Sequence, residues 1–299
     1  MQAIYNILRA IRIHQWTKNF IVFIPLLASH KLTDPARLSE SILAFVSFCF
    51  TASAAYIIND LHDLAADRQH PQKSKRPIAS GKLSKTFAFG LLVLLLAGVL
   101  VINLLWTNIN FCFWLLCYFL LSNAYSFFFK KRLLADVFVL AALYTLRIFA
   151  GGAAEGVAIS QWLMMFSLFF FLSVAFTKRF TELYTQRSTD QKSLPGRGYL
   201  PPDFEILRVV GPANGYLAIL VLALYVNSPD VQLLYKTPNL LWLLCPLLGY
   251  WITRIWFIAN RGHLHHDPVA FALTDFKSYL TALCCAIVVI AASFKLWPL

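Results

Sequence analysis

The chain has 299 residues, of which 59% are hydrophobic and 13% charged, and its formal net charge is +12. Soluble domains carry about 25% charged residues, so this balance excludes an ordinary soluble domain and indicates a membrane protein. The positive charge alone would suit a nucleic-acid partner. We expect no such partner, because most of the basic residues fall in the connections on one side of the apolar segments.

Residues 1–18 predict a short amphipathic helix. Apolar residues at positions 4, 7, 8 and 11 recur at helical spacing, opposite Arg9 and Arg12. A helix of this kind lies along a membrane surface with its apolar face among the lipids. We therefore expect an interfacial helix on the cytoplasmic face of the membrane.

Long apolar runs follow, and a helix needs about 20 apolar residues to cross a bilayer core of roughly 30 Å. Nine runs approach that length, and the first, which contains Pro25, is the weakest. We expect an all-α integral membrane protein, a bundle of nine transmembrane helices in a single domain covering 1–299. The predicted spans are 19–33, 37–58, 86–105, 109–129, 134–154, 161–177, 206–227, 238–257 and 278–297.

Three connections between these spans are long and polar, namely 59–85, 178–205 and 254–277. All three fall on the side that carries most of the basic residues, which the positive-inside rule assigns to the cytoplasm. Loops that gather on one face of a helix bundle are where a site is built. The sequence thus predicts a multi-pass protein of the inner membrane with an active-site cavity that faces the cytoplasm.

The first of these loops carries a stripe of polar side chains directly after the span 37–58. At helical spacing the members of the stripe point the same way. Aligned carboxylates repel one another unless a cation lies between them, and Mg²⁺ prefers carboxylates together with phosphate oxygens. The stripe consists of Asn59, Asp60, Asp63 and Asp67.

Lys75 and Arg76 follow the stripe and are able to neutralise phosphate charge. The combination predicts a metal–diphosphate site at a membrane surface. The alternative is a solvated loop whose mixed charges pair with one another.

The string N-D-x-x-D-x-x-x-D at 59–67, followed by RPIASG at 76–81, resembles the first aspartate-rich motif of the intramembrane UbiA prenyltransferase superfamily. The resemblance implies nine transmembrane helices around a cytoplasm-facing cavity in which the aspartates hold Mg²⁺ against a diphosphate. Typical aromatic prenyltransferases of the superfamily carry a second aspartate-rich motif after the sixth helix. This chain has Lys178, Arg179 and Glu182 there, and a Lys–Arg pair suits direct contact with a phosphate group.

Four further segments, at 12–27, 125–152, 178–183 and 261–275, are similar to the decaprenyl-phosphate phosphoribosyltransferase branch of the superfamily. This similarity covers nearly the whole chain. It implies Mg²⁺-dependent transfer of 5-phosphoribose from phosphoribosyl diphosphate (PRPP) to a polyprenyl phosphate, with inversion at the anomeric carbon and release of diphosphate. Members of that branch supply the arabinan precursor for cell wall biosynthesis.

Under this resemblance Asp60, Asp63 and Asp67 are catalytic residues that hold the metal, and Asn59 is a further metal ligand. A charge inside a span is costly and usually serves a site or an ion pair, so Arg147 either contacts substrate or pairs with Asp136. The candidates for contact with substrate phosphates are Lys18, Lys75, Arg76, Lys130, Arg147, Lys178 and Arg179, together with Glu182.

Two other functions are compatible with the sequence. One is a UbiA-type prenyltransferase that uses a prenyl diphosphate donor and an aromatic acceptor. The other is a lipid transporter or a non-catalytic lipid-binding protein, although we find no internal repeat of the kind common in transporters. A homo-oligomer is as compatible with the sequence as a monomer. The segment from His263 to Asp267, with three histidines, predicts a capped turn before Pro268 rather than a zinc site.

Overall fold

The computed structural model describes residues 2–29, 31, 33–70, 72–187, 198–264 and 267–294. Every regular element in these ranges is a helix. Contacts gather in two compact units. Unit 1 comprises Met1–Phe129 and Leu143–Ile159, and unit 2 comprises Lys130–Ala142 and Ser160–Leu299. The single domain expected from the sequence stays a prediction.

Eight helices in the described ranges are long and apolar enough to cross a membrane. Unit 1 contains α3 (Pro35–His62), α5 (Lys85–Trp106), α6 (Ile109–Phe127) and the larger part of α7 (Ala135–Ala154). Unit 2 contains the first turns of α7, then α8 (Gln161–Arg187), α9 (Asp203–Val226), η4 (Pro238–Leu243) continued by α11 (Leu244–Asn260), and α13 (Phe276–Ser293). The prediction of an all-helical membrane protein is therefore confirmed.

The span predicted at 19–33 is not a long helix, so the described residues hold eight helices of spanning length and not nine. The segment folds as the 3₁₀-helix η1 (Ile13–Phe23) followed by the short helix α2 (Ile24–Ala28), whose first turn contains Pro25. A 3₁₀-helix rises about 2.0 Å per residue, compared with about 1.5 Å in an α-helix. The segment Ile13–Ala28 is therefore about 30 Å long if it runs straight, which is close to the thickness of a bilayer core.

The amphipathic N-terminal helix is shorter than predicted. It is α1 (Gln2–Ala10), on which Ile4 and Tyr5 are exposed and Asn6 and Ala10 are buried. The helix cannot continue to residue 18, because Arg12 has a φ of 53° in the left-handed region. This turn leads the chain from α1 into η1.

Polar residues define the ends of the long helices. Asp34, Ser84, Asn108 and Asp275 lie just before α3, α5, α6 and α13, and each side chain accepts a hydrogen bond from a backbone N–H of the first turn. These N–H groups have no partner within the helix itself. Short polar strings between apolar runs thus set where each span begins.

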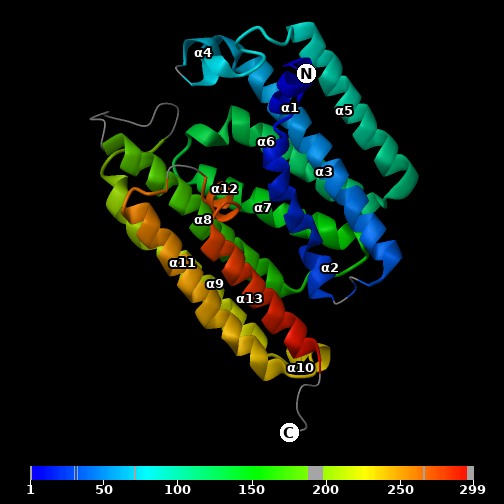
Figure 1. Cartoon of the computed structure of the whole chain (residues 1–299), viewed down its shortest axis with the longest axis vertical. Coiled ribbons are helices and arrows are strands. Elements are labelled where there is room, and N and C mark those ends of the chain that lie inside the picture. Colours follow the sequence, from blue (N-terminus) through cyan, green and yellow to red (C-terminus); the bar gives the residue numbers. More distant parts are fainter. Residues whose placement is uncertain are drawn as a thin grey trace. The chain divides into compact units, whose positions relative to one another are not determined.

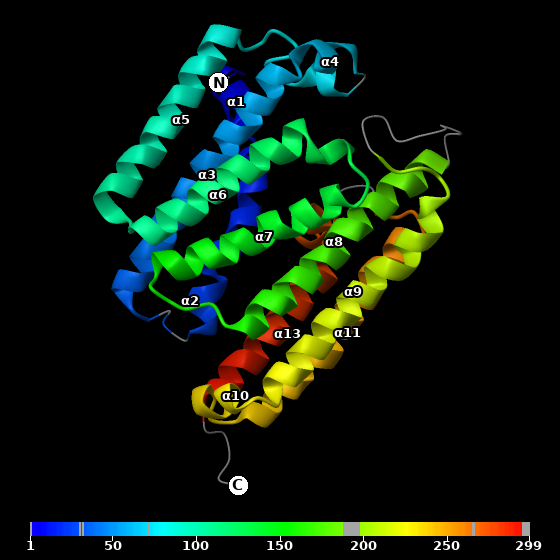
Figure 2. The same ribbon diagram turned by 180° about the vertical axis from the view of Figure 1, so that it is seen from behind.

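In unit 1, α3 is the central element, and Figures 1 and 2 show α5 running alongside it. Ala54 and Ile57 of α3 pack with Ala88 and Leu92 of α5 in one buried cluster. The segment η1 also runs along α3, where the indole of Trp16 donates a hydrogen bond of 3.0 Å to Ser53. This packing brings the N-terminal segment to the same end of α3 as Asp60.

In unit 2, α8 and α9 lie side by side, and α11 packs on both (Figure 2). Gly211 on α9 permits close approach, because a Cβ atom there would lie 2.1 Å from the ring of Trp256 on α11. Helices α8 and α11 extend to Arg187 and Asn260, so the predicted loops 178–205 and 254–277 begin inside helices. Residues 188–197 of the first of these loops, and His265 and His266 in the second, lie outside the described residues.

Candidate active site

The acidic stripe lies where α3 ends and the short helix α4 (Leu64–Gln69) begins. Asp60 is on the last turn of α3 and Asp67 is on α4, and their side chains are 3% and 2% exposed. The backbone N–H of Asp67 donates to the carbonyl of Asp63 at 2.8 Å, so α4 begins directly after α3. As a result, Asp60 and Asp67 point toward the same place.

That place is occupied by the guanidinium group of Arg76. Its Nη1 atom lies 3.0 Å from Oδ1 of Asp60 and 2.6 Å from Oδ2 of Asp67. The two carboxylate oxygens are therefore no farther apart than the sum of these distances. Arg76, which follows the acidic stripe in the sequence, thus joins the carboxylates of Asp60 and Asp67.

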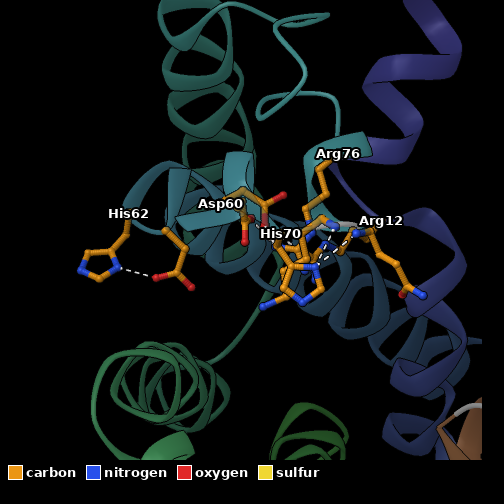
Figure 3. Close-up of polar contacts among 9 residues, drawn as sticks. Arg12, Asp60, His62, His70 and Arg76 are labelled. Carbon is orange, nitrogen blue, oxygen red and sulfur yellow. Dashed lines mark hydrogen bonds and ion pairs between the residues drawn. The ribbon is translucent and has the colours of Figure 1, made fainter. Parts of the chain in front are cut away.

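A second guanidinium group, that of Arg12, reaches the same carboxylate of Asp60. Its Nη2 atom lies 2.6 Å from Oδ1 of Asp60 (Figure 3). Its carbon Cζ lies 4.4 Å from the ring centre of Tyr56. Sequence reasoning missed Arg12 as a site residue and placed it only on the polar face of the first helix. The left-handed backbone at Arg12, which turns the chain back toward α3, leaves no signal in the sequence pattern.

Asp63 does not join this cluster. Its Oδ1 atom lies 2.9 Å from Nδ1 of His62, and Figure 3 shows His62 on the opposite side of Asp60 from Arg12 and Arg76. The reason is that α3 ends here, with Asp63 as its C-terminal cap, so the uninterrupted stripe assumed from the spacing is broken. Asn59 is half-buried on the preceding turn.

The predicted four-residue metal set is thus not assembled. In the part of the chain that the structure describes, no three acidic, histidine or cysteine side chains form a group that could hold a metal ion. Asp60 and Asp67 alone do fit a hard cation, because they are buried oxygen donors that converge on one point. Mg²⁺ is commonly held by one or two carboxylates, with substrate phosphates and water completing its shell.

The loop after the stripe is well packed and directs Arg76 inward. Ile78 and Ala79 are buried, and the carbonyl of Arg76 accepts a hydrogen bond of 2.9 Å from the N–H of Ser80. Gly81 closes the turn with a φ of 77°, a conformation that favours glycine. Lys75, directly before Arg76, is exposed.

In unit 2, Arg179 lies in a buried ionic network and not on a surface. Its side chain is fully buried, its Nε atom lies 2.5 Å from Oδ2 of Asp136, and its Nη1 atom pairs with Glu182. The hydroxyl of Tyr199 donates a hydrogen bond of 2.7 Å to the other oxygen of Asp136. Burial, followed by the neighbouring carboxylate of Asp136, raises the pKa of Tyr199, which therefore stays a neutral donor.

Lys178 is more accessible than its neighbour Arg179. Its side chain is 29% exposed, and its Nζ atom lies 2.9 Å from Oδ2 of Asp267. Asp267 also accepts a hydrogen bond from the N–H of Val269 and so caps the short helix α12 (Pro268–Ala272), in agreement with the predicted capped turn. Lys18, on η1 in unit 1, and Lys130, on the short 3₁₀-helix η3 (Phe129–Lys131) in unit 2, are half-buried.

Arg147 does not pair with Asp136, whose carboxylate is engaged by Arg179 and Tyr199. Its guanidinium group instead donates hydrogen bonds to the side chain of Asn19 at 2.9 Å and to the hydroxyl of Tyr118 at 2.9 Å. Of the two interpretations from the sequence, an ion pair with Asp136 is therefore wrong. Substrate contact by Arg147 stays a prediction.

Comparison with known proteins decides the family. The sequence model of the UbiA prenyltransferase family matches residues 20–281. The chain belongs to this family.

Several curated proteins are similar to this UbiA chain along most of its length. It is 40% identical to the uncharacterized protein y4nM of Sinorhizobium fredii over 91% of the chain, but it spans only 53% of that protein. It is 35% identical to the nodulation protein NoeC of Azorhizobium caulinodans, covering 92% of the chain and 89% of NoeC. A decaprenyl-phosphate phosphoribosyltransferase of Corynebacterium glutamicum is 34% identical over 62% of the chain and 57% of that enzyme.

Solved structures show the same fold. A UbiA homolog from Archaeoglobus fulgidus bound to GPP and Mg²⁺ has a TM-score of 0.70 at 19% sequence identity, covering 96% of this chain and 99% of that one. A digeranylgeranylglyceryl phosphate synthase has a TM-score of 0.67, also at 19% identity, covering 99% and 100% of the two chains. At this identity the likeness concerns the fold alone.

Proposed function

We propose that this UbiA protein transfers 5-phosphoribose from PRPP to a polyprenyl phosphate in the membrane and releases diphosphate. The observation that carries the proposal is the buried pair Asp60 and Asp67, joined by Arg76 at one end of α3. Such a site suits a metal-bound diphosphate. The decaprenyl-phosphate phosphoribosyltransferases at 34% and 35% identity over 62% of the chain support PRPP as the donor.

In this proposal Asp60 and Asp67 hold Mg²⁺, with Asn59 and Asp63 as adjoining ligands that the sequence motif suggests. When bound, the metal supplies positive charge that stabilises the departing diphosphate. To hold the metal, the two carboxylates would have to give up contacts with the guanidinium groups of Arg12 and Arg76. Arg12 and Arg76 then donate hydrogen bonds to diphosphate oxygens, which are good acceptors for the planar guanidinium fork.

The transfer itself needs little chemistry from side chains. An oxygen of the lipid phosphate forms a bond to the anomeric carbon of the pentose, the bond from that carbon to diphosphate breaks, and the electron pair leaves with diphosphate. A single displacement inverts the configuration. The acceptor oxygen is anionic near neutral pH because the second pKa of a phosphate monoester is about 6, so no general base has to remove a proton.

The task of the protein is to bring two polyanions together and hold them in line. Their repulsion is strong in surroundings of low dielectric constant. Lys75 is exposed beside Arg76 and suits the donor. Lys18, in the same unit as Asp60 and Asp67, is the candidate for the acceptor phosphate, and contact of Lys130 and Lys178 with a substrate phosphate stays a prediction from the sequence. Arg179, which is fully buried, acts as a positioning residue that fixes the part of α8 next to Lys178.

We further propose that the end of α3 with Asp60 faces the cytoplasm of an inner-membrane protein. The distribution of basic residues supports this orientation. A role in supplying an arabinan precursor is implied by resemblance to the branch and stays a prediction for this chain.

A second candidate is prenyl transfer from a prenyl diphosphate to an aromatic acceptor. It is favoured by the family itself and by the fold shared with the homolog that binds GPP and Mg²⁺. The pair Asp60 and Asp67 would hold the metal in the same way, so the acidic site alone does not separate the two donors.

The test is a choice of donor. Purified protein with Mg²⁺ receives either PRPP and a polyprenyl phosphate, or geranyl diphosphate and an aromatic acid. We expect a lipid-extractable phosphoribose product from the first mixture only, and none after chelation of the metal. Prenylation of the aromatic acid, with no phosphoribose in the lipid phase, would establish the second candidate instead.

A further inference from the structure

Arg147 on α7 is a buried cation in the membrane-spanning part of unit 1. Its side chain is 6% exposed, and three hydrogen bonds engage it: from Nε to Asn19, from Nη1 to the carbonyl of Leu143 at 2.5 Å, and from Nη2 to Tyr118. All three acceptors are neutral. Among the residues that the structure describes, Arg147 forms no ion pair with a carboxylate.

This arrangement leaves a full positive charge without a counter-charge. A guanidinium group stays protonated in proteins and has five N–H groups, of which the three hydrogen bonds use three. The faces of Tyr118 and Tyr144 lie 4.6 Å and 5.4 Å from its Cζ atom and supply cation–π attraction, but no negative charge. Because a buried charge inside a span is costly, it usually marks a site for an ion or substrate.

The position of Arg147 separates it from the acidic pair. Its Cζ atom lies 6.0 Å from the ring of Phe48, which precedes Asp60 by twelve positions on α3. At a rise of about 1.5 Å per residue, the Cα atoms of Phe48 and Asp60 are about 18 Å apart. Tyr118, which accepts a hydrogen bond from Arg147, also interacts electrostatically with Tyr56, one turn of α3 before Asp60. Arg147 therefore lies toward the middle of α3 from the acidic pair, where it can take an anionic group other than the diphosphate.

We propose that Arg147, oriented by Asn19 and Tyr118, is a second anion site that binds a phosphate monoester group of a substrate. The inference rests on the proposed function, in which both reactants carry such a group: the 5-phosphate of PRPP and the phosphate of the lipid. A phosphate supplies the missing negative charge and accepts hydrogen bonds from the remaining N–H groups. A prenyl chain at the same place would leave the cation covered by apolar groups.

The alternative is that Arg147 only cross-links η1, α6 and α7 through neutral hydrogen bonds. Asn19→Asp separates the two roles. The substitution keeps an oxygen acceptor next to Nε and places a carboxylate there, so the cross-link is retained as an ion pair while the net charge of the site is cancelled. An anion site loses its ligand, whereas a cross-link is preserved.

The experiment measures binding in detergent with Mg²⁺, and turnover is not needed. The probes are inorganic diphosphate, PRPP and a short-chain polyprenyl phosphate, and the proteins are wild type, Asn19→Asp and the control Asn103→Asp. Asn103 lies on α5 within a span and is half-buried, and its side chain donates to the carbonyl of Val99 and accepts from Thr107 and Cys112, none of which is a cation. It therefore reports the effect of replacing a half-buried amide by a carboxylate away from Arg147.

We expect Asn19→Asp to weaken binding of PRPP or of the lipid phosphate at least tenfold, leaving diphosphate binding within twofold of wild type. The probe whose binding weakens identifies which substrate supplies the phosphate. Wild-type affinity for both monoesters in folded Asn19→Asp would overturn the inference, as would a wild-type protein that binds neither. If PRPP and the lipid phosphate bind as expected but no phosphoribose is transferred, the proposed function fails and the anion site stands.

A second pair of variants covers the case in which Asn19→Asp does not fold. Arg147→Lys retains the charge, and Arg147→Gln removes it but keeps hydrogen-bonding capacity. We expect Lys to keep monoester binding within about tenfold of wild type and Gln to lose it. Equal loss in both variants would assign Arg147 a structural role only.

Discussion

Arg12 and Asp60 are 48 positions apart in the chain, and their side chains form an ion pair with Nη2 of Arg12 2.6 Å from Oδ1 of Asp60. The pair fastens the left-handed turn after α1 to the end of α3. It also means that two arginines, Arg12 and Arg76, balance the two buried carboxylates Asp60 and Asp67. In the proposed function Asp60 and Asp67 would hold the metal, and Arg12 and Arg76 would donate hydrogen bonds to the diphosphate.

Replacing Asp60 tests this cluster most simply. Asp60→Asn keeps the shape of the side chain but removes the charge that holds a metal, so we expect turnover to fall at least about 100-fold. Removing one partner of a buried ion pair also destabilises the fold, because Arg12 and Arg76 lose a counter-charge. Turnover and size-exclusion behaviour of the purified variant provide the measurement. Asp34→Asn is the matched control, since asparagine also caps the start of α3, and wild-type turnover in Asp60→Asn would refute the assignment.

Substitution of the two remaining aspartates of the motif, Asp63 and Asp67, should not lower turnover equally. Asp67 shares Arg76 with Asp60, whereas Asp63 pairs with His62. We therefore expect Asp67→Asn to lower turnover at least as much as Asp63→Asn does, measured side by side at saturating Mg²⁺. A larger loss in Asp63→Asn would mean that Asp63 is the stronger metal ligand, as the uninterrupted helical stripe alone predicts.

The neighbouring residues Lys75 and Arg76 should also differ in how much they contribute to diphosphate binding. Arg76 bridges both carboxylates, whereas Lys75 is exposed. Arg76→Lys cannot reproduce the fork geometry, and we expect it to weaken diphosphate binding by about tenfold or more. For Lys75→Gln the expected change is about fivefold or less, because exposed charges contribute about 1 kcal/mol at most. Titration calorimetry with diphosphate and Mg²⁺ compares the two, and a reversed order would place the donor on the outer side of the loop.

Glu155, just after α7, predicts a pH dependence of stability. Burial raises the pKa of its carboxyl group to about 7, and the hydrogen bond from Ser41 opposes that rise only in part. A carboxyl group whose pKa is higher in the folded protein stabilises the fold at low pH, and this contribution is lost as the pH rises from about 4.5 to about 7. We expect the free energy of unfolding in detergent to decline over that range by up to about 3 kcal/mol.

The matched variant for this prediction is Glu155→Gln. It keeps the contact with Ser41 but does not titrate, so its stability curve should be flatter than that of the wild type between pH 5 and pH 7.5. Parallel curves for the two proteins would show that another group causes the decline.

Much of the fold follows from patterns that are local in sequence. Apolar runs of spanning length and polar caps such as Asp34 and Asp275 indicate where eight helices lie. The first span was wrong as a long helix, because the period of apolar residues does not distinguish a 3₁₀-helix with Pro25 at its end from an α-helix.

The site was predictable only where its residues are close in sequence. Asp60, Asp67 and Arg76 are close in sequence, at the end of α3 and in the segment that follows it, and they do converge. The contact of Arg12 with Asp60 depends on a left-handed turn and on packing along α3, which no local pattern encodes. Likewise, the sequence predicts that Arg179 contacts a substrate phosphate, and its burial against Asp136 depends on tertiary structure that no local pattern encodes.

The central claim is that the bond between the pentose and diphosphate of PRPP breaks at the site of Asp60 and Asp67. Its most direct test uses PRPP labelled with one isotope in the pentose and another in the β-phosphate, with a polyprenyl phosphate and Mg²⁺. We expect the pentose label to enter the lipid phase and an equal amount of the other label to appear in the aqueous phase as diphosphate. In Asp60→Asn we expect the formation of both labelled products to fall together. A pentose label that stays in the aqueous phase with the wild-type protein would contradict the claim.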